Sequence, residues 1–263
     1  MRKRFLFILL LLPIGLMAQI DHEDILSVEY GGIWQNDEYL SPLLYEGRYI
    51  GIANQWNQSF RRDSSWSHTA DLRFTGARLY NKRKYNIYYS LGLQTDWNAV
   101  YNFRQMLGVR GLNIYIGPSI DLDFMGRYHY SNYNKPVSLD FAIVLGARAG
   151  LSYSFAAKKT SYRVSYDIQT SLLGAMFVPD FWQSYYEISE SLKGTIVCAN
   201  VANRQLLRHQ LSLDMQFRHS AWRVAVRHEY LQYKAHDLFF SREEVSLVVS
   251  TIFHFSSKIK VFL

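Results

Sequence analysis

The sequence predicts an all-β protein, and more specifically an antiparallel transmembrane β-barrel of about ten strands, with eight or twelve strands as the alternatives. Residues 1–18 have the pattern of an export signal, and the rest of the chain alternates apolar and polar residues in segment after segment. Aromatic residues make up 16% of the chain, which fits strands with one apolar and one polar face.

The first eighteen residues are expected to form a cleavable secretory signal peptide. Arg2, Lys3 and Arg4 precede an apolar run that ends at Met17, and the small residue Ala18 stands at the expected cleavage site. This run is shorter than the roughly 20 residues of a membrane helix, and no second run of that length follows. We therefore expect export to the outer membrane, with residues 19–263 forming one barrel.

Composition excludes several functional classes. The formal net charge of +7 becomes +4 without Arg2, Lys3 and Arg4, and an excess of that size in an exported chain does not indicate a nucleic-acid partner. Cys198 is the only cysteine, so no intramolecular disulfide forms. The histidines lack metal-ligand spacing, and no phosphate or dinucleotide motif is present, so we expect neither a metal nor a cofactor.

Ten alternating segments define the predicted strands. Each has about ten residues or more, which matches the roughly 9 to 11 residues of a tilted strand that crosses a bilayer and exceeds the usual strand of a soluble sheet. The segments are residues 25–34, 48–57, 67–77, 85–103, 112–123, 138–155, 161–172, 204–217, 222–233 and 243–255.

The alternation itself justifies these elements in chain order. The segment 85–103 is continued past Thr95 because an earlier end would leave a long connection on the side where barrels have short turns. In 161–172 and again in 204–217, apolar residues such as Leu211 alternate with polar residues such as Gln210. The last segment places its apolar side chains on one face, with Val245, Leu247, Val249, Phe253 and Phe255 among them.

A soluble sandwich and a membrane barrel both bury such strands, and the polar face favours the barrel. That face is rich in arginine and carboxylates and almost free of lysine, which is typical of a crowded lumen with paired charges. It includes Glu29, Asp71, Arg73, Asp96 and Glu244. The predicted lumen charge network consists of Asp121, Asp123, Asp140, Arg148, Arg163, Asp167, Arg208, Asp214, Arg223, Arg227 and Glu229.

Connection lengths predict the orientation of the barrel. With both termini in the periplasm, the extracellular connections have about 13, 7, 14, 31 and 9 residues, and the periplasmic ones about 9, 8, 5 and 4. The connection 173–203 is the longest, and it carries Trp182, Tyr185, Tyr186 and Glu187. Long loops of this kind are usually functional, so we expect it either to cap or plug the barrel or to bind a ligand or protein.

Three short runs resemble a known family. They are Tyr39-Leu40-Ser41-Pro42-Leu43, Gly117-Pro118-Ser119-Ile120-Asp121-Leu122 and Phe181-Trp182-Gln183-Ser184-Tyr185-Tyr186-Glu187. Together with the export signal and the alternation, they resemble the Bacteroidota outer-membrane family known as domain of unknown function 3316. The resemblance implies a barrel and assigns no activity to it.

Candidate catalytic residues are few. His129 and Ser131 have the spacing used by some outer-membrane lipid hydrolases, in which a histidine activates a serine, with Asp140 or Glu187 as a third member. Both residues are expected in an extracellular loop. Asp121 and Asp123 share one strand face and form either a cation site or acid pair, or ion pairs with Arg148 or Arg163.

These observations lead to two functional hypotheses. The first is a barrel with a largely filled polar lumen and a structural, binding or narrow-transport role, since ten strands enclose little more space than the eight that side chains fill. The alternative is a hydrolase that modifies lipid or lipopolysaccharide. In either case the expected partners are outer-membrane lipid and lipopolysaccharide, and the sequence specifies no protein partner.

Overall fold

The computed structural model describes residues 20–59, 65–104, 108–133, 136–157, 160–180 and 193–257. The predicted signal peptide lies outside this part of the chain, which contains no helix long and apolar enough to cross a membrane. Its strands are β1 (Ile20–Asp37), β2 (Ser41–Ser59), β3 (Trp66–Asn81), β4 (Ile87–Arg104), β5 (Leu112–His129), β6 (Val137–Ala157), β7 (Thr160–Phe177), β8 (Ile196–Asn200), β9 (Arg204–Gln216), β10 (Ala221–Ala235) and β11 (Leu238–Ser257).

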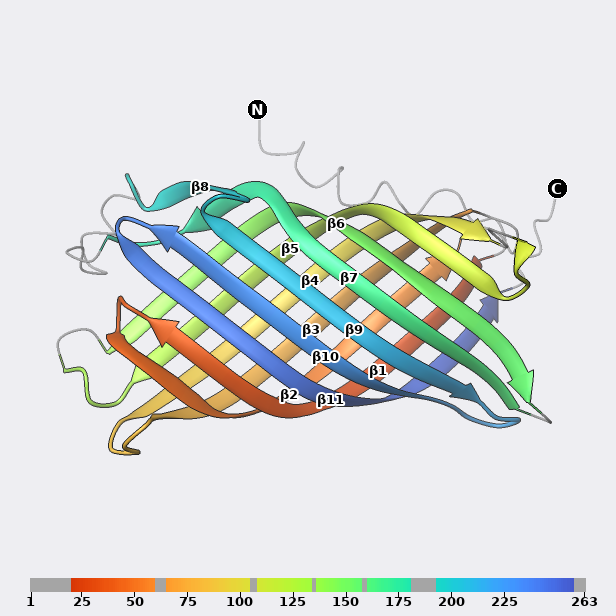
Figure 1. The fold of residues 1–263 in the computed structure, drawn as a ribbon, viewed down its shortest axis with the longest axis horizontal. Coiled ribbons are helices and arrows are strands. Elements are labelled where there is room, and N and C mark those ends of the chain that lie inside the picture. Colours follow the sequence, from red (N-terminus) through yellow and green to blue (C-terminus); the bar gives the residue numbers. More distant parts are fainter. Residues whose placement is uncertain are drawn as a thin grey trace, which may run out of the picture.

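The strands form a closed antiparallel barrel (Figure 1). Neighbours in sequence pair from β1 to β7, β7 pairs with β9, and β11 closes the ring against β1. The short β8 pairs only with the end of β7, through Leu173–Phe177. Both β8 and β9 are antiparallel to β7, and only residues 201–203 separate them. They are therefore two consecutive parts of one barrel strand that runs beside β7. The predicted barrel of ten strands is confirmed.

The strands are longer than the alternation predicts, so several expected connections were wrong. The first connection is not about 13 residues but residues 38–40, a tight turn in which Asp37 accepts a hydrogen bond from the Tyr39 amide at 3.1 Å. The expected 173–203 loop contains the end of β7 and all of β8. At the distal ends inward side chains such as Met125, Met176 and Phe240 are apolar as well, so the alternation fades while the backbone pairing continues.

The outer face carries an apolar band between two rings of aromatic side chains. Exposed residues such as Ile50, Phe74 and Leu247 form the band. One ring, with Trp66, Tyr101 and Trp222, lies toward the end where β1 begins and β11 ends, called the terminal end below. The other, with Trp34, Tyr89 and Tyr128, lies toward the opposite, distal end. Aromatic rings of this kind mark the two bilayer interfaces.

The backbone pairing between β4 and β5 is interrupted at Gly117 and Pro118 of β5. Pairing of β5 with β4 stops opposite these two residues and resumes at Ile116. Proline has no amide hydrogen to donate, and a Cβ at Gly117 would overlap the carbonyl oxygen of Ala99. The β4 and β5 backbones therefore approach each other closely at this point.

Candidate functional site

Five buried aromatic side chains lie in the distal end of the lumen, and we define them as the distal cluster: Tyr39, Tyr45, Tyr88, Tyr233 and Phe240. All five side chains are at most 6% exposed. The rings of Tyr45 and Tyr88 have centroids 5.1 Å apart, and those of Tyr233 and Phe240 lie 4.8 Å apart. Aromatic side chains therefore pack directly against each other in this part of the lumen.

Arg127 is buried inside the distal cluster, where it contacts an aromatic ring and two carboxylates. Its guanidinium lies 4.4 Å from the centroid of the Phe240 ring and forms ion pairs with Asp37 and Asp140. The Tyr88 hydroxyl donates to Asp37 at 3.2 Å, and the Tyr233 hydroxyl donates to Asp140 at 2.6 Å. Asp140 was predicted to face the lumen, whereas Arg127 and Asp37 lie beyond the predicted strand ends.

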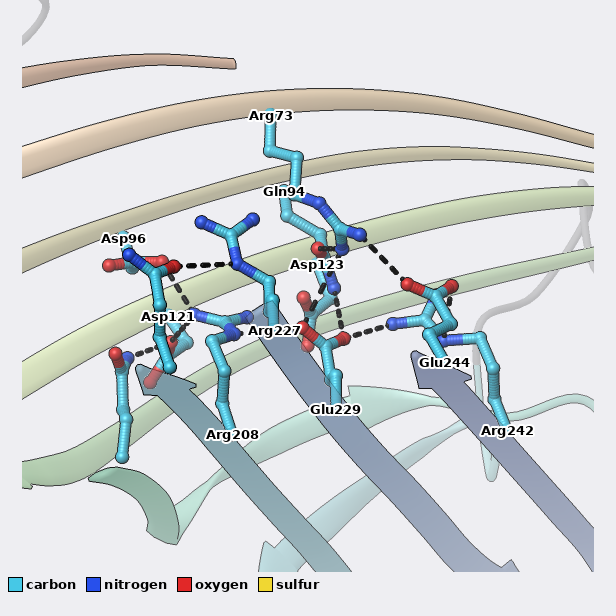
Figure 2. A network of polar contacts seen from close by, with 12 residues as sticks. Arg73, Gln94, Asp96, Asp121, Asp123, Arg208, Arg227, Glu229, Arg242 and Glu244 are labelled. Carbon is cyan, nitrogen blue, oxygen red and sulfur yellow. Dashed lines mark hydrogen bonds and ion pairs between the residues drawn. The ribbon is translucent and has the colours of Figure 1, made fainter. Parts of the chain in front are cut away.

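Below the distal cluster lies the central network, a group of twelve residues that fills the cross-section of the barrel. It consists of Glu29, Arg73, Gln94, Asp96, Asp121, Asp123, Arg204, Arg208, Arg227, Glu229, Arg242 and Glu244, most of which are labelled in Figure 2. They come from β1, β3, β4, β5, β9, β10 and β11, so the contacts cross the lumen.

Arg73 holds one half of the central network. Its Nη2 lies 2.9 Å from a carboxylate oxygen of Glu29 and 2.9 Å from one of Glu244, and its Nη1 donates to Gln94 at 2.6 Å. The side chain is 2% exposed. Arg227 completes this half with an ion pair of 2.6 Å to Glu29. Two arginines thus offset the burial of two glutamates.

Glu229 and Arg208 hold the other half. Glu229 pairs with Arg208 at 2.8 Å and with Arg242 at 2.5 Å, and it accepts a hydrogen bond from Gln94 at 2.8 Å. Arg208 reaches Asp96 on β4 at 2.8 Å. Since β4 and β9 lie on opposite sides of the ring, these contacts bridge the lumen, as Figure 2 shows.

The structure places the predicted aspartates of β5 in ion pairs, but with other partners than expected. Asp123 pairs with Arg204, and Asp121 lies 3.9 Å from Arg208 and accepts a hydrogen bond from Gln169 at 2.6 Å. The expected pairing with Arg148 or Arg163 was therefore wrong, because those arginines lie nearer the terminal end. In the described residues, no group of three or more His, Cys, Asp or Glu is placed to hold a metal ion.

The remaining predicted charges line a polar vestibule that opens at the terminal end. Arg148 pairs with Asp167 at 2.8 Å, while Arg163 and Arg223 both pair with Asp214. The vestibule has a volume of about 380 Å³. A space of about 40 Å³ lies beside the central network, and one of about 10 Å³ lies among residues of the distal cluster and the distal turns. Of these three spaces, the vestibule at the terminal end is the largest.

The predicted catalytic pair is not brought together. His129 was expected in a loop, but it is the last residue of β5, is 4% exposed and forms a hydrogen bond of 2.6 Å with the Tyr45 hydroxyl. Ser131 is exposed in the following turn. Asp140 contacts Arg127 and Tyr233 instead of His129. The loop candidates Trp182, Tyr185, Tyr186 and Glu187 lie outside the described residues.

Residues 5–255 match the family model described as "Protein of unknown function (DUF3316)". The chain belongs to this family. The DUF3316 match covers the described strands up to Phe255 of β11 and agrees with the resemblance seen in the sequence. No curated protein matches the sequence.

Several solved structures are similar to this DUF3316 chain. The outer membrane protease OmpT from Escherichia coli is 8% identical, with 90% of this chain and 97% of that chain covered and a TM-score of 0.47. Neisserial surface protein A is 11% identical, with 87% and 96% covered and a TM-score of 0.32. The toluene transporter TodX of Pseudomonas putida is 10% identical, with 92% and 91% covered and a TM-score of 0.34. At these identities no activity or site residue transfers to this chain.

Proposed function

We propose that this protein is a non-conducting outer-membrane barrel that acts by binding and by its structure, and not by passing solutes. The observation that carries the proposal is the filling of the lumen by two consecutive layers, the distal cluster and the central network. A ten-stranded barrel has little interior space beyond what side chains occupy, and here charged and aromatic side chains occupy it.

The outer face supports the membrane location. An apolar band between two aromatic rings is the surface that a lipid bilayer covers, and burial of that band replaces the core of a soluble protein. We place the terminal end in the periplasm, because both ends of the described chain lie there and the longest connection leaves β7 after Phe177 and rejoins β8 at Ile196, both at the distal end. The vestibule then faces the periplasm.

The polar vestibule supports binding as its mode of action. Amide and hydroxyl side chains line it together with arginines, among them Arg148, Arg163 and Arg223, and with the carboxylates of Glu23 and Asp167. A molecule that enters from the terminal end meets the central network. A vestibule lined by amides, hydroxyls and charges of both signs fits a small polar ligand that offers hydroxyl groups.

Single-channel recording in planar bilayers tests the proposal. Refolded protein, shown to be folded by its heat-modifiable gel mobility, is expected to give no conductance steps. The Phe240→Ala variant, which weakens only the distal cluster, is expected to stay silent as well, because the central network still closes the lumen. Steady conductance by the folded wild-type barrel would overturn the proposal.

A further inference from the structure

Two arginines lie side by side on the outer face near the distal end. Arg48 of β2 and Arg78 of β3 are direct register partners, and both are exposed. Like charges at opposed positions of neighbouring strands repel each other. None of the ion pairs among the described residues includes either arginine. Neither guanidinium of this pair is therefore engaged in an ion pair with a carboxylate of the described residues.

Tyrosines fix the depth of this pair relative to the bilayer. The Arg78 guanidinium lies 5.1 Å from the centroid of the Tyr80 ring and 5.9 Å from that of Tyr89. Tyr89 is directly opposite Arg78 in the sheet and belongs to the distal aromatic ring. Because tyrosines gather at the level of lipid headgroups, the Arg78 guanidinium lies at that level too.

The neighbouring turn adds three more cations. Lys82, Arg83 and Lys84 form the tip between β3 and β4, and all three are exposed. The segment from Ala77 to Thr95 contains no acidic residue. We call the five cations Arg48, Arg78, Lys82, Arg83 and Lys84 the basic corner. Glu46, two residues from Arg48 on the same outer face, is the acidic residue beside it.

An apolar surface continues from the basic corner toward the terminal end. On β2 and β3 the outward residues that follow are Ile50, Ile52 and Phe74, which are 60%, 56% and 48% exposed. A ligand that fits both regions has a phosphorylated head and long apolar chains. Arginine is well suited to the head, because its planar guanidinium binds phosphate through two hydrogen bonds at once.

We propose that the basic corner is a binding site for a phosphate of lipopolysaccharide, with the acyl chains of that lipid packed along Ile50, Ile52 and Phe74. The inference rests on the proposed membrane location and orientation, which put the distal end in the outer leaflet. It goes beyond the lumen, because it assigns a ligand to the outside of the wall. Arg48 and Arg78 hold the phosphate, and the turn lysines attract it over longer range.

Native mass spectrometry of refolded protein in an uncharged detergent tests the site. Wild-type protein is titrated with lipopolysaccharide and compared with a double variant, Arg48→Gln with Arg78→Gln. The matched control is Arg110→Gln with Arg218→Gln, which removes two exposed arginines from turns at the terminal end. We expect the double variant to lose at least about tenfold in affinity, the control to match the wild type, and both to keep heat-modifiable mobility.

Two further arms identify the source of the phosphate. Dephosphorylated lipopolysaccharide is expected to bind wild type and double variant equally weakly, and inorganic phosphate at the same phosphate concentration is expected not to displace the lipid. Equal lipopolysaccharide binding by double variant and control would overturn the site, and displacement by inorganic phosphate would overturn its assignment to lipid. The measurement is made in detergent, so its outcome is independent of conductance and orientation, and a failure here leaves the proposed function standing.

Discussion

Arg73 on β3 and Glu244 on β11 form an ion pair of 2.9 Å across the lumen, although 171 residues separate them in the chain and β2 and β1 lie between their strands. Neither side chain is more than 3% exposed. A contact of this kind joins two parts of the wall from the inside. The lumen of this barrel is therefore a polar core, and its charges affect stability before they affect transport.

Replacing Arg73 should strongly destabilise the barrel. Arg73→Ala leaves Glu29 and Glu244 buried with fewer partners, and loss of one member of a buried pair costs about 3 to 5 kcal/mol. Urea unfolding in detergent measures this free energy. The control is Arg163→Ala, because the Arg163 side chain is 36% exposed and its partner Asp214 keeps an ion pair with Arg223, so a smaller loss is expected. Equal losses in both variants would contradict a packed central network.

An arginine introduced on the outer face should lower the stability of the barrel by an amount that depends on its depth in the bilayer. Leu211 of β9 is 54% exposed within the apolar band, and Phe217, 44% exposed, follows the last residue of the same strand. Leu211→Arg should cost about 2 to 4 kcal/mol and Phe217→Arg about 0 to 1 kcal/mol, since an arginine is most costly near the bilayer midplane. Unfolding in lipid vesicles compares the two variants. Similar costs would mean that Leu211 does not lie at mid-membrane depth.

Because the β4 and β5 backbones lie close together at Gly117, we expect a glycine-to-alanine substitution to destabilise the barrel there but not at Gly126 of the same strand. Gly117→Ala places a Cβ against the Ala99 carbonyl oxygen and should cost at least about 1 to 3 kcal/mol, as overpacking does. At Gly126 a Cβ would lie 3.5 Å from a Leu139 methyl carbon, which is an ordinary contact, so Gly126→Ala should be tolerated. The folded fraction on an unheated gel separates them, and equal folding would show that the β4 and β5 backbones do not meet as described.

Cysteine labelling tests the proposed orientation. In a Cys198→Ser background, Tyr133→Cys places a thiol in the distal turn, where Tyr133 is 91% exposed, and His219→Cys places one in the terminal turn. A membrane-impermeant maleimide should label Tyr133→Cys on intact cells and His219→Cys only after lysis. The reverse pattern would place the terminal end, and with it the vestibule, at the cell surface.

The sequence predicted the site residues in the middle of the strands and missed those near the strand ends. The polar face predicted most of the central network, but it missed Arg204 and Arg242 of that network and Arg127 of the distal cluster, since each lies at or beyond an end of a predicted strand. His129 was misplaced for the same reason, because β5 continues past residue 123. At the distal end inward side chains such as Met125 and Phe240 are apolar as well, so the contrast on which a period of two depends weakens.

The sequence by itself determined the barrel, the number of its strands and which side chains lie on its outer face. Alternation is a local property of the chain, so the inward and outward residues of each strand can be assigned without knowing which strands lie beside it. Only the tertiary structure decided that Arg73 meets Glu244, that Arg208 meets Asp96, and that Tyr233 packs on Phe240 at the distal end. Those contacts depend on register and on the closure of the ring, which bring together residues that no local pattern relates.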